Sequence, residues 1–117
     1  MTIRTAIVDD EPLARRRIRH LLADQADVDV IAECTNGKEA IESLDAAPPD
    51  LLFLDIQMPE VDGFDVLQAI GAGRVPAVIF VTAFDQFALR AFEAQALDYL
   101  LKPFDDERFC AALQRAR

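Results

Sequence analysis

The sequence predicts one α/β domain in which helices cover both faces of a parallel sheet. Short apolar runs alternate with amphipathic stretches five times along the 117 residues, a pattern typical of strands joined by helical crossovers. Three of the runs are almost continuously apolar, as strands buried on both faces are. Hydrophobic residues make up 52% of the chain and charged residues 28%, which indicates a globular protein.

The apolar runs are the expected strands. They span, in chain order, Arg4–Val8, Val28–Ala32, Leu51–Leu54, Ala77–Val81 and Asp98–Leu101. The second run differs from the others because Asp29 separates Val28 from Val30. This alternation is typical of an edge strand with one face toward solvent.

Helical spacing of apolar residues fills the intervals between the strands. Pro12 suits the first turn of the first helix, where its missing N–H costs nothing, and Ile18 and Leu22 share one face of it. Four further helices are expected over Gly37–Leu44, from Gly63 through Phe64, Leu67 and Ile70, over Gln86–Glu93, and over Asp105–Arg115.

Strict alternation of strands and helices requires right-handed crossovers between parallel strands. Five strands and five helices favour the flavodoxin-like, doubly wound (βα)5 fold with strand order 2-1-3-4-5. In that order, ligands bind outside the carboxyl ends of the first and third strands. Residues 1–117 are expected to form this one domain, with any output domain outside the chain.

Four charged residues follow three of the expected strands. Asp9 and Asp10 come after the first strand, Asp55 after the third and Lys102 after the fifth. Any one of them could simply cap a helix or belong to a turn. Together, however, the buried carboxylates would repel one another unless a cation is present. Mg²⁺ meets that requirement, so the sequence predicts a metal site beside a nucleophilic carboxylate that accepts a phosphoryl group.

The overall charge argues against several partners. A net charge of −9 repels a phosphate backbone, so this domain alone is not expected to bind nucleic acid. We interpret the basic residues Arg15–Arg17 and Arg19 as a solvated helix face in preference to a docking surface.

No apolar run approaches the ~20 residues of a membrane span, so we expect no membrane association and a cytoplasmic location. Cys34 and Cys110 lack metal or redox spacing and are expected to be buried or half-buried thiols.

Across its whole length the chain resembles the receiver domains of bacterial two-component response regulators. The shared motifs are Asp9-Asp10, Asp55 with Met58-Pro59 and Asp62-Gly63, Thr82-Ala83, and Lys102-Pro103-Phe104. The stretch TAFDQFALRAFEAQALDYLLKPF further resembles receivers of the LytTR-type, or LytR/AlgR-like, regulators. That resemblance implies an output domain that binds DNA and regulates transcription.

The family resemblance implies a role for each residue of the metal site. Asp55 would be the phosphoacceptor that takes a phosphoryl group from a sensor histidine kinase. Asp10, Asp55 and the backbone carbonyl of Gln57 would ligate Mg²⁺ (or Mn²⁺), and Asp9 would act through a bound water. Gly63 ends the loop after the third strand and can take φ values that other residues avoid.

The resemblance also implies how the phosphoryl group is held. Lys102 and the hydroxyl of Thr82 would each bind one phosphoryl oxygen. Ala83 follows Thr82 and is small enough to leave room for the donor. Phe84 lies two residues past Thr82, and we hypothesise that its bulk shields the acyl phosphate from water. The bond between Lys102 and Pro103 is expected to be cis.

Thr82 and Tyr99 resemble the switch pair of this family. When the Thr82 hydroxyl moves toward the phosphoryl group, Tyr99 would rotate inward and alter the surface of the fourth helix, fifth strand and fifth helix. We expect phosphorylation to promote homodimerisation through that surface. Phe84, Phe87 and Phe92 are expected to lie mostly in the core, with any exposed remainder contributing to the dimer.

Three other classes of protein are alternatives to this interpretation. A haloacid dehalogenase-type enzyme needs an acid two residues after its nucleophile, where Gln57 stands, so only self-phosphorylation and slow autodephosphorylation are expected. A flavin-binding module needs a phosphate-cradling loop, which Asp9-Asp10-Glu11 would oppose without a metal. A phosphorylation-independent pseudo-receiver is disfavoured by Asp55, Thr82 and Lys102 but stays open.

Overall fold

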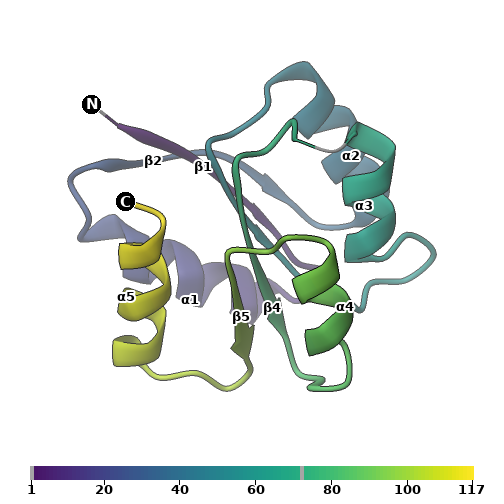
Figure 1. Cartoon of the computed structure of the whole chain (residues 1–117). Helices are drawn as coiled ribbons and strands as arrows, with labels where there is room; N and C mark the ends of the chain where they lie inside the picture. The colour runs from purple at the N-terminus through teal and green to yellow at the C-terminus, as the bar shows by residue number, and fades with distance from the viewer. Residues whose placement is uncertain (1, 72) are drawn as a thin grey trace.

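The computed structural model describes residues 2–71 and 73–117, which form a parallel sheet between two layers of helices (Figure 1). Within these residues the strands are β1 (Ile3–Val8), β2 (Val28–Cys34), β3 (Leu51–Leu54), β4 (Ala77–Thr82) and β5 (Asp98–Leu101). The helices are α1 (Pro12–Ala23), α2 (Gly37–Ala46), α3 (Gly63–Ile70), α4 (Ala88–Glu93) and α5 (Asp106–Arg115). The strand order is β2-β1-β3-β4-β5, all parallel, so the predicted fold is confirmed.

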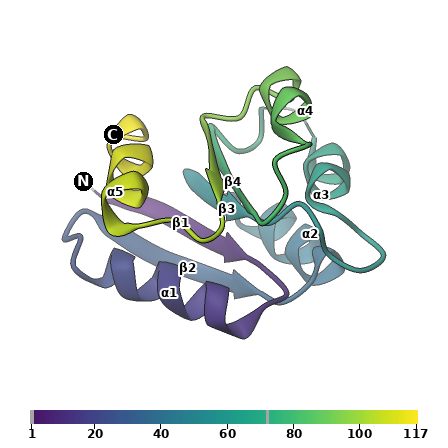
Figure 2. The same ribbon diagram turned by 90° about the horizontal axis from the view of Figure 1, so that it is seen from below.

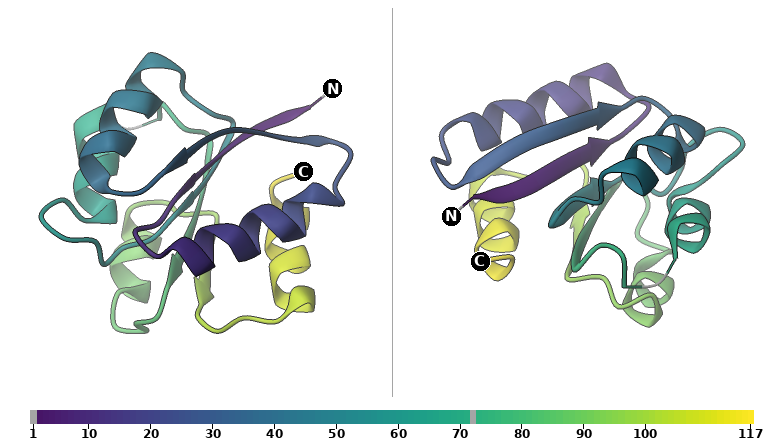
Figure 3. Two further views of the ribbon diagram at one scale, coloured as in Figure 1. Left: turned by 180° about the vertical axis from the view of Figure 1, so that it is seen from behind. Right: turned by 90° about the horizontal axis from the view of Figure 1, so that it is seen from above.

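The sheet separates two apolar cores. On one side α1 and α5 pack on the sheet, and on the other side lie α2, α3 and α4 (Figures 2 and 3). Phe53 and Phe109 stack with their ring centroids 5.2 Å apart in the first core, and Phe64 lies 5.0 Å from Phe80 in the second. The central strand β3 is buried over all of its residues, as its apolar sequence predicts.

Strand β2 lies at the edge of the sheet, as its alternating sequence predicts. It extends to Cys34, past the expected end at Ala32, and its pairing register with β1 shifts between Thr5 and Ala6. The shift leaves Ile31 without a partner on β1, and its side chain is 37% exposed. Beyond the shift, the strands remain paired up to the residues that precede Asp9.

Side-chain caps define where three of the helices begin. Asn36 accepts a hydrogen bond from the backbone of Glu39 at the start of α2, and Asp105 accepts one from the backbone of Arg108 at the start of α5. Asp62 and Asp65 form a reciprocal capping box at the start of α3, which stabilises the helix that follows the Asp55 loop. Helix α4 begins at Ala88, later than the expected Gln86, and Phe87 supplies no side-chain cap.

The two cysteines differ in their environments. Cys34 is buried, as expected, but Cys110 is exposed. Cys110 lies between the inward-facing Phe109 and Ala112 on α5, and a helix turns by about 100° per residue, so it faces away from the sheet. The described part of the chain contains no helix long and apolar enough to cross a membrane.

Candidate functional site

The sequence-predicted site residues meet at the carboxyl edge of the sheet. Asp9 and Asp10 directly follow β1, Asp55 follows β3, Thr82 ends β4 and Lys102 follows β5. Parallel strands bring their carboxyl ends to one edge of the sheet. Because β1, β3 and β4 are neighbours, Asp9, Asp55 and Thr82 lie at the ends of adjacent strands.

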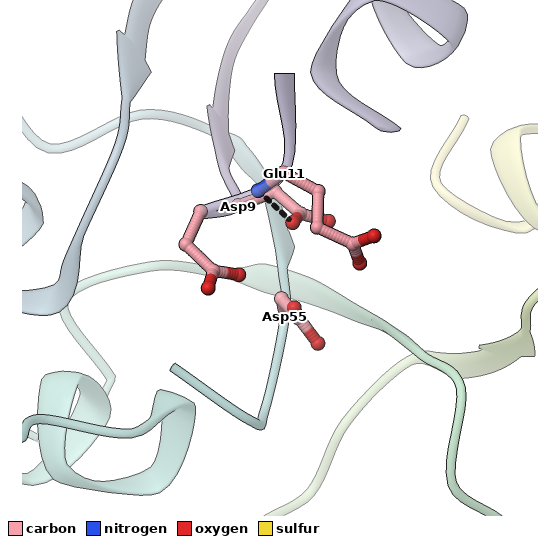
Figure 4. A group of neighbouring side chains, drawn as sticks. Asp9, Glu11 and Asp55 are labelled. Carbon is pink, nitrogen blue, oxygen red and sulfur yellow. Dashed lines mark hydrogen bonds between the residues drawn. The ribbon is translucent and has the colours of Figure 1, made fainter. Parts of the chain in front are cut away.

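The acidic residues form a compact group. Asp9, Asp10, Glu11 and Asp55 each offer a carboxylate oxygen, and these oxygens all lie within 4.8 Å of one another. Figure 4 shows Asp9, which follows β1, and Glu11, at the start of α1, beside Asp55. Asp9 and Asp55 are only 1% and 4% exposed, whereas Glu11 is open to solvent. The group could hold a metal ion.

One buried oxygen of Asp9 provides a test of whether a cation fits. Its Oδ1 accepts a hydrogen bond from the backbone N–H of Glu11 at 2.9 Å. Its Oδ2 is buried and accepts no well-directed hydrogen bond from the described residues, although Lys102 Nζ lies 2.9 Å away. Buried charged oxygens need hydrogen bonds or a cation. The carboxylates are also hard oxygen donors of the kind Mg²⁺ prefers, so this set of residues fits a divalent cation.

Lys102 brings the one ammonium group that contacts these acids in the described chain. Its Nζ lies 2.8 Å from Glu11 Oε1, 2.9 Å from Asp9 Oδ2 and 3.6 Å from Asp55 Oδ2. Burial acts to lower the pKa of Lys102, but the contacts with Glu11, Asp9 and Asp55 outweigh it and raise the pKa. Lys102 is therefore charged at neutral pH.

The carboxyl group of Asp55 titrates near neutrality. Burial is the largest cause, the charges of Asp9 and Asp10 add to it, and Lys102 opposes it, so that the pKa of Asp55 rises from 3.8 to about 7. A nucleophilic carboxylate must be ionised. An added cation would favour the ionised form by the same electrostatics.

The loop after β3 is shaped by close backbone contact. Gly63 donates its N–H to the carbonyl of Ile56 at 2.9 Å, and a Cβ at this position would lie 2.5 Å from the carbonyl oxygen of Asp55. Gly63 does not use its freedom to adopt a positive φ. The positive φ in this loop, 68°, belongs to Glu60, and glycine is needed at 63 because the backbone passes directly over Asp55.

Thr82 and Tyr99 are linked through the loop after β4. The fully buried Thr82 accepts a hydrogen bond at its Oγ1 from the backbone N–H of Phe84, at 3.3 Å. The hydroxyl of half-buried Tyr99 donates to the backbone carbonyl of Phe84, and burial raises the Tyr99 pKa. Ala83 is exposed between them. The bond between Lys102 and Pro103 is cis, the conformation expected from the sequence.

The aromatic residues near α4 divide differently from the expectation that they are mostly core. Phe87 is half-buried and Ala91 is buried on the inner face. Phe92 is 78% and Phe84 41% exposed, so this expectation is wrong for both. The helix has six residues and only one face against the domain, and Phe92 lies next to Ala91 on the other face.

Sequence reasoning missed two contacts at the site. Glu11 joins the acidic group and pairs with Lys102, and Arg15 donates its Nη1 to the backbone carbonyl of Asp9 at 2.8 Å. The available signal was position: Glu11 directly follows Asp9-Asp10, and Arg15 lies one helical turn further along α1.

The chain has close relatives among curated proteins. The transcriptional regulatory protein BtsR of Escherichia coli (strain K12) is 45% identical over 115 residues, which cover 98% of this chain and 48% of BtsR. The BtsR of Salmonella typhi is 46% identical over the same shares of both chains. This chain therefore spans about half the length of the curated relatives it matches.

Solved structures with the same fold are also similar in sequence. The response regulatory domain of protein mrkE from Klebsiella pneumoniae has a TM-score of 0.90 at 31% identity, over 97% of this chain and 94% of that one. The BeF3-activated DrrB receiver domain has a TM-score of 0.82 at 27% identity, over 99% and 97%. The family model described as the response regulator receiver domain matches residues 5–114. With the fold, the acidic edge and these matches in agreement, the chain belongs to the family of response regulator receiver domains.

Proposed function

We propose that Asp55 accepts a phosphoryl group from a sensor histidine kinase in a Mg²⁺-dependent reaction. The single observation that best supports this proposal is the position of Asp55: it is buried, grouped with three other acids, and 3.6 Å from the ammonium of Lys102. Residues 1–117 would form the receiver domain of a longer, cytoplasmic regulator. The domain would undergo self-phosphorylation from a donor and slow autodephosphorylation, without turnover of free phosphoesters.

The chemistry is one displacement at phosphorus. An Asp55 carboxylate oxygen forms a bond to phosphorus while the bond from phosphorus to the donor breaks, and the leaving group takes that electron pair. Such transfers depend on positioning and on neutralising charge at the phosphoryl oxygens. Lys102 supplies one positive charge there, and the Thr82 hydroxyl would bind a second oxygen. A bound Mg²⁺ would supply further neutralisation.

The proposal gives each of the aspartates in the acidic group a role in binding the metal ion. Asp10 and Asp55 would bind Mg²⁺ (or Mn²⁺) directly, together with the backbone carbonyl of Gln57, and Asp9 would act through a water. The buried Oδ2 of Asp9, which is paired with Lys102 but accepts no well-directed hydrogen bond, supports a further hydrogen-bond donor such as a water at that position. The similarity to a BeF3-activated receiver domain supports a phosphoryl site in this fold.

We further propose that phosphorylation controls dimerisation and an output. Tyr99 and Thr82 would be the switch residues, since both contact Phe84 in the loop before α4. The homodimer would form through α4, β5 and α5, where Leu89 and Phe92 are 70% and 78% exposed. The output would be transcription regulation by a LytTR-type DNA-binding domain. The transcriptional regulatory role named for BtsR supports the first part of that assignment, and the sequence resemblance supports the second.

The proposal is tested by intact mass after incubation with acetyl phosphate. We expect the wild-type chain to gain the mass of one phosphoryl group with Mg²⁺ and none with EDTA. Asp55→Asn should gain nothing, whereas Asp29→Asn, an exposed aspartate on β2, should behave like wild type. A gain that persists in Asp55→Asn would identify another nucleophile. No gain in any protein would favour a phosphorylation-independent binding module.

A further inference from the structure

Lys102 is held more closely by two other carboxylates than by the one it is proposed to serve. Its Nζ lies 2.8 Å from Glu11 and 2.9 Å from Asp9, but 3.6 Å from Asp55. Glu11 is not one of the metal ligands proposed above, and its contact with Lys102 joins residues 91 positions apart. This ion pair therefore bridges the start of α1 and the end of β5.

We propose that Glu11 is a positioning residue that holds Lys102 beside Asp9 before phosphorylation and releases it to a phosphoryl oxygen on Asp55. This inference rests on the proposed phosphoacceptor role of Asp55. On phosphorylation, the Glu11 carboxylate gives up the ammonium to a group of higher negative charge.

The side chain of Glu11 is oriented for this contact. Glu11 occupies the N-cap position of α1, yet its carboxylate makes no capping hydrogen bond to the helix. Its backbone N–H is bound to Asp9 Oδ1 at 2.9 Å, which fixes the base of the side chain at the edge of the site. From that fixed base, the carboxylate reaches across to Lys102.

The difference in burial decides which partner Lys102 gives up. The side chain of Asp9 is 1% exposed, whereas that of Glu11 is 62% exposed. A buried carboxylate that loses its cation suffers a large desolvation penalty, but an exposed one is rehydrated by water. Glu11 is therefore the readily exchanged partner, and Asp9 keeps its contact with the ammonium.

The test compares the affinity for beryllium fluoride, a phosphoryl mimic, in wild type and in Glu11→Gln. The chain has one tyrosine and no tryptophan, so its intrinsic fluorescence reports on Tyr99 alone. All titrations are made at saturating Mg²⁺, determined for each protein separately, so that a change in metal affinity does not enter. We expect Glu11→Gln to bind beryllium fluoride about two- to five-fold more tightly, the range of an exposed ion pair.

Two further variants separate a specific contact from a general charge effect. Glu11→Asp keeps the charge but shortens the side chain, and we expect it to bind more tightly than wild type as well. Glu42→Gln removes one exposed charge on α2 and should match wild type. The ¹⁵N resonance of the Lys102 ammonium should shift in both Glu11 variants before any ligand is added, and remain unchanged in Glu42→Gln.

Unchanged or weaker binding by Glu11→Gln at saturating Mg²⁺ would overturn the inference while leaving the role of Asp55 intact. An increase in Glu11→Gln that is matched by Glu42→Gln would also overturn it, because the effect would then be one of net charge. If wild type neither binds beryllium fluoride nor gains phosphoryl mass, the proposed function itself fails, and this inference fails with it.

Discussion

The carboxyl edge of the sheet buries charged side chains, whereas the outer face of α4 exposes apolar ones. At the edge, Asp9 and Asp55 are 1% and 4% exposed, whereas on α4, Leu89 and Phe92 are 70% and 78% exposed. A buried carboxylate and a contiguous exposed apolar surface are each unfavourable for an isolated domain. Each region therefore suits a further component: positive charge at the edge, and a protein surface on α4.

The two regions also differ in how far other residues of the chain offset the buried charge at the edge or cover the apolar side chains on α4. Lys102 already supplies one positive charge to the buried acids. On α4, the inward face holds the buried Ala91, and the half-buried Phe87 lies just before the helix, whereas Phe92 stands outside. Substitutions at the edge should therefore change the stability of the monomer, and substitutions on α4 should change association.

The largest expected effect is the loss of Lys102. Lys102→Ala leaves Asp9 and Asp55 without their ammonium partner, and we expect the free energy of unfolding in EDTA at pH 8 to fall by about 2–3 kcal/mol. This is less than the ~3–5 kcal/mol for a fully buried pair, because Lys102 keeps 15% exposure. Urea unfolding measures it, and Lys38→Ala, exposed on α2, is the control. Equal losses in both variants would show that the edge is not under electrostatic stress.

The exposed aromatic on α4 should matter only for association. We expect Phe92→Ala to weaken the dimer of the beryllium fluoride-bound domain by about 2 kcal/mol, the effect of an aromatic hot spot, and to leave monomer stability within about 0.5 kcal/mol of wild type. Sedimentation equilibrium measures the first and urea unfolding the second. Leu13→Ala is the matched control, because Leu13 is 77% exposed but lies on α1. A wild-type domain that stays monomeric with the mimic would refute the proposed interface.

The buried carboxyl at the edge should make stability depend on pH. Asp55 has a folded pKa of about 7 against 3.8 unfolded, so its protonated form stabilises the fold, fully below pH 3.8 and progressively less as pH rises through 7. Between pH 6 and 8.5 in EDTA, this group should lower the free energy of unfolding by about 1.4 kcal/mol. Asp55→Asn should remove that part of the slope. A slope identical in both proteins would assign it to other groups.

The smallest expected effect concerns Phe84, which follows Thr82 by two residues and donates its backbone N–H to the Thr82 hydroxyl. If its side chain shields the acyl phosphate, Phe84→Ala should lose the phosphoryl group several-fold faster than wild type, measured by intact mass over time. Leu13→Ala serves as the control, since it removes an exposed apolar side chain on α1, away from the proposed interface. An unchanged or slower rate in Phe84→Ala would reject shielding.

The fold, and the residues that lie together at the site, could be predicted because both follow from the periodic pattern of apolar residues along the chain. Apolar runs gave the strand positions, and parallel strands necessarily bring residues such as Asp9, Asp55 and Lys102 to one edge. The roles of these residues in phosphoryl transfer stay predictions until the experiments above are made.

What could not be predicted depends on contacts between distant segments or on the angle of a helix. Gly63 is required by the backbone of Asp55 beneath it, and no local pattern reveals such an approach. In the sequence Glu11 is simply the third of three acidic residues, and its contact with Lys102 arises only because the fold brings the end of β5 beside it. For Phe92 and Cys110, apolar character suggested burial, but each points away from the sheet because its neighbour points toward it.

The division of the interior into two separate cores restricts how this domain can be recombined. Phe80 and Val81 are adjacent in β4, yet Phe80 packs with α2, α3 and α4, and Val81 with α1 and α5. A crossover that exchanges a continuous block of sequence with a relative therefore cuts through both cores at once. A chimera that transplants one helical layer must exchange alternate residues of each central strand, and its packing defects should remain confined to the side of the sheet that was exchanged.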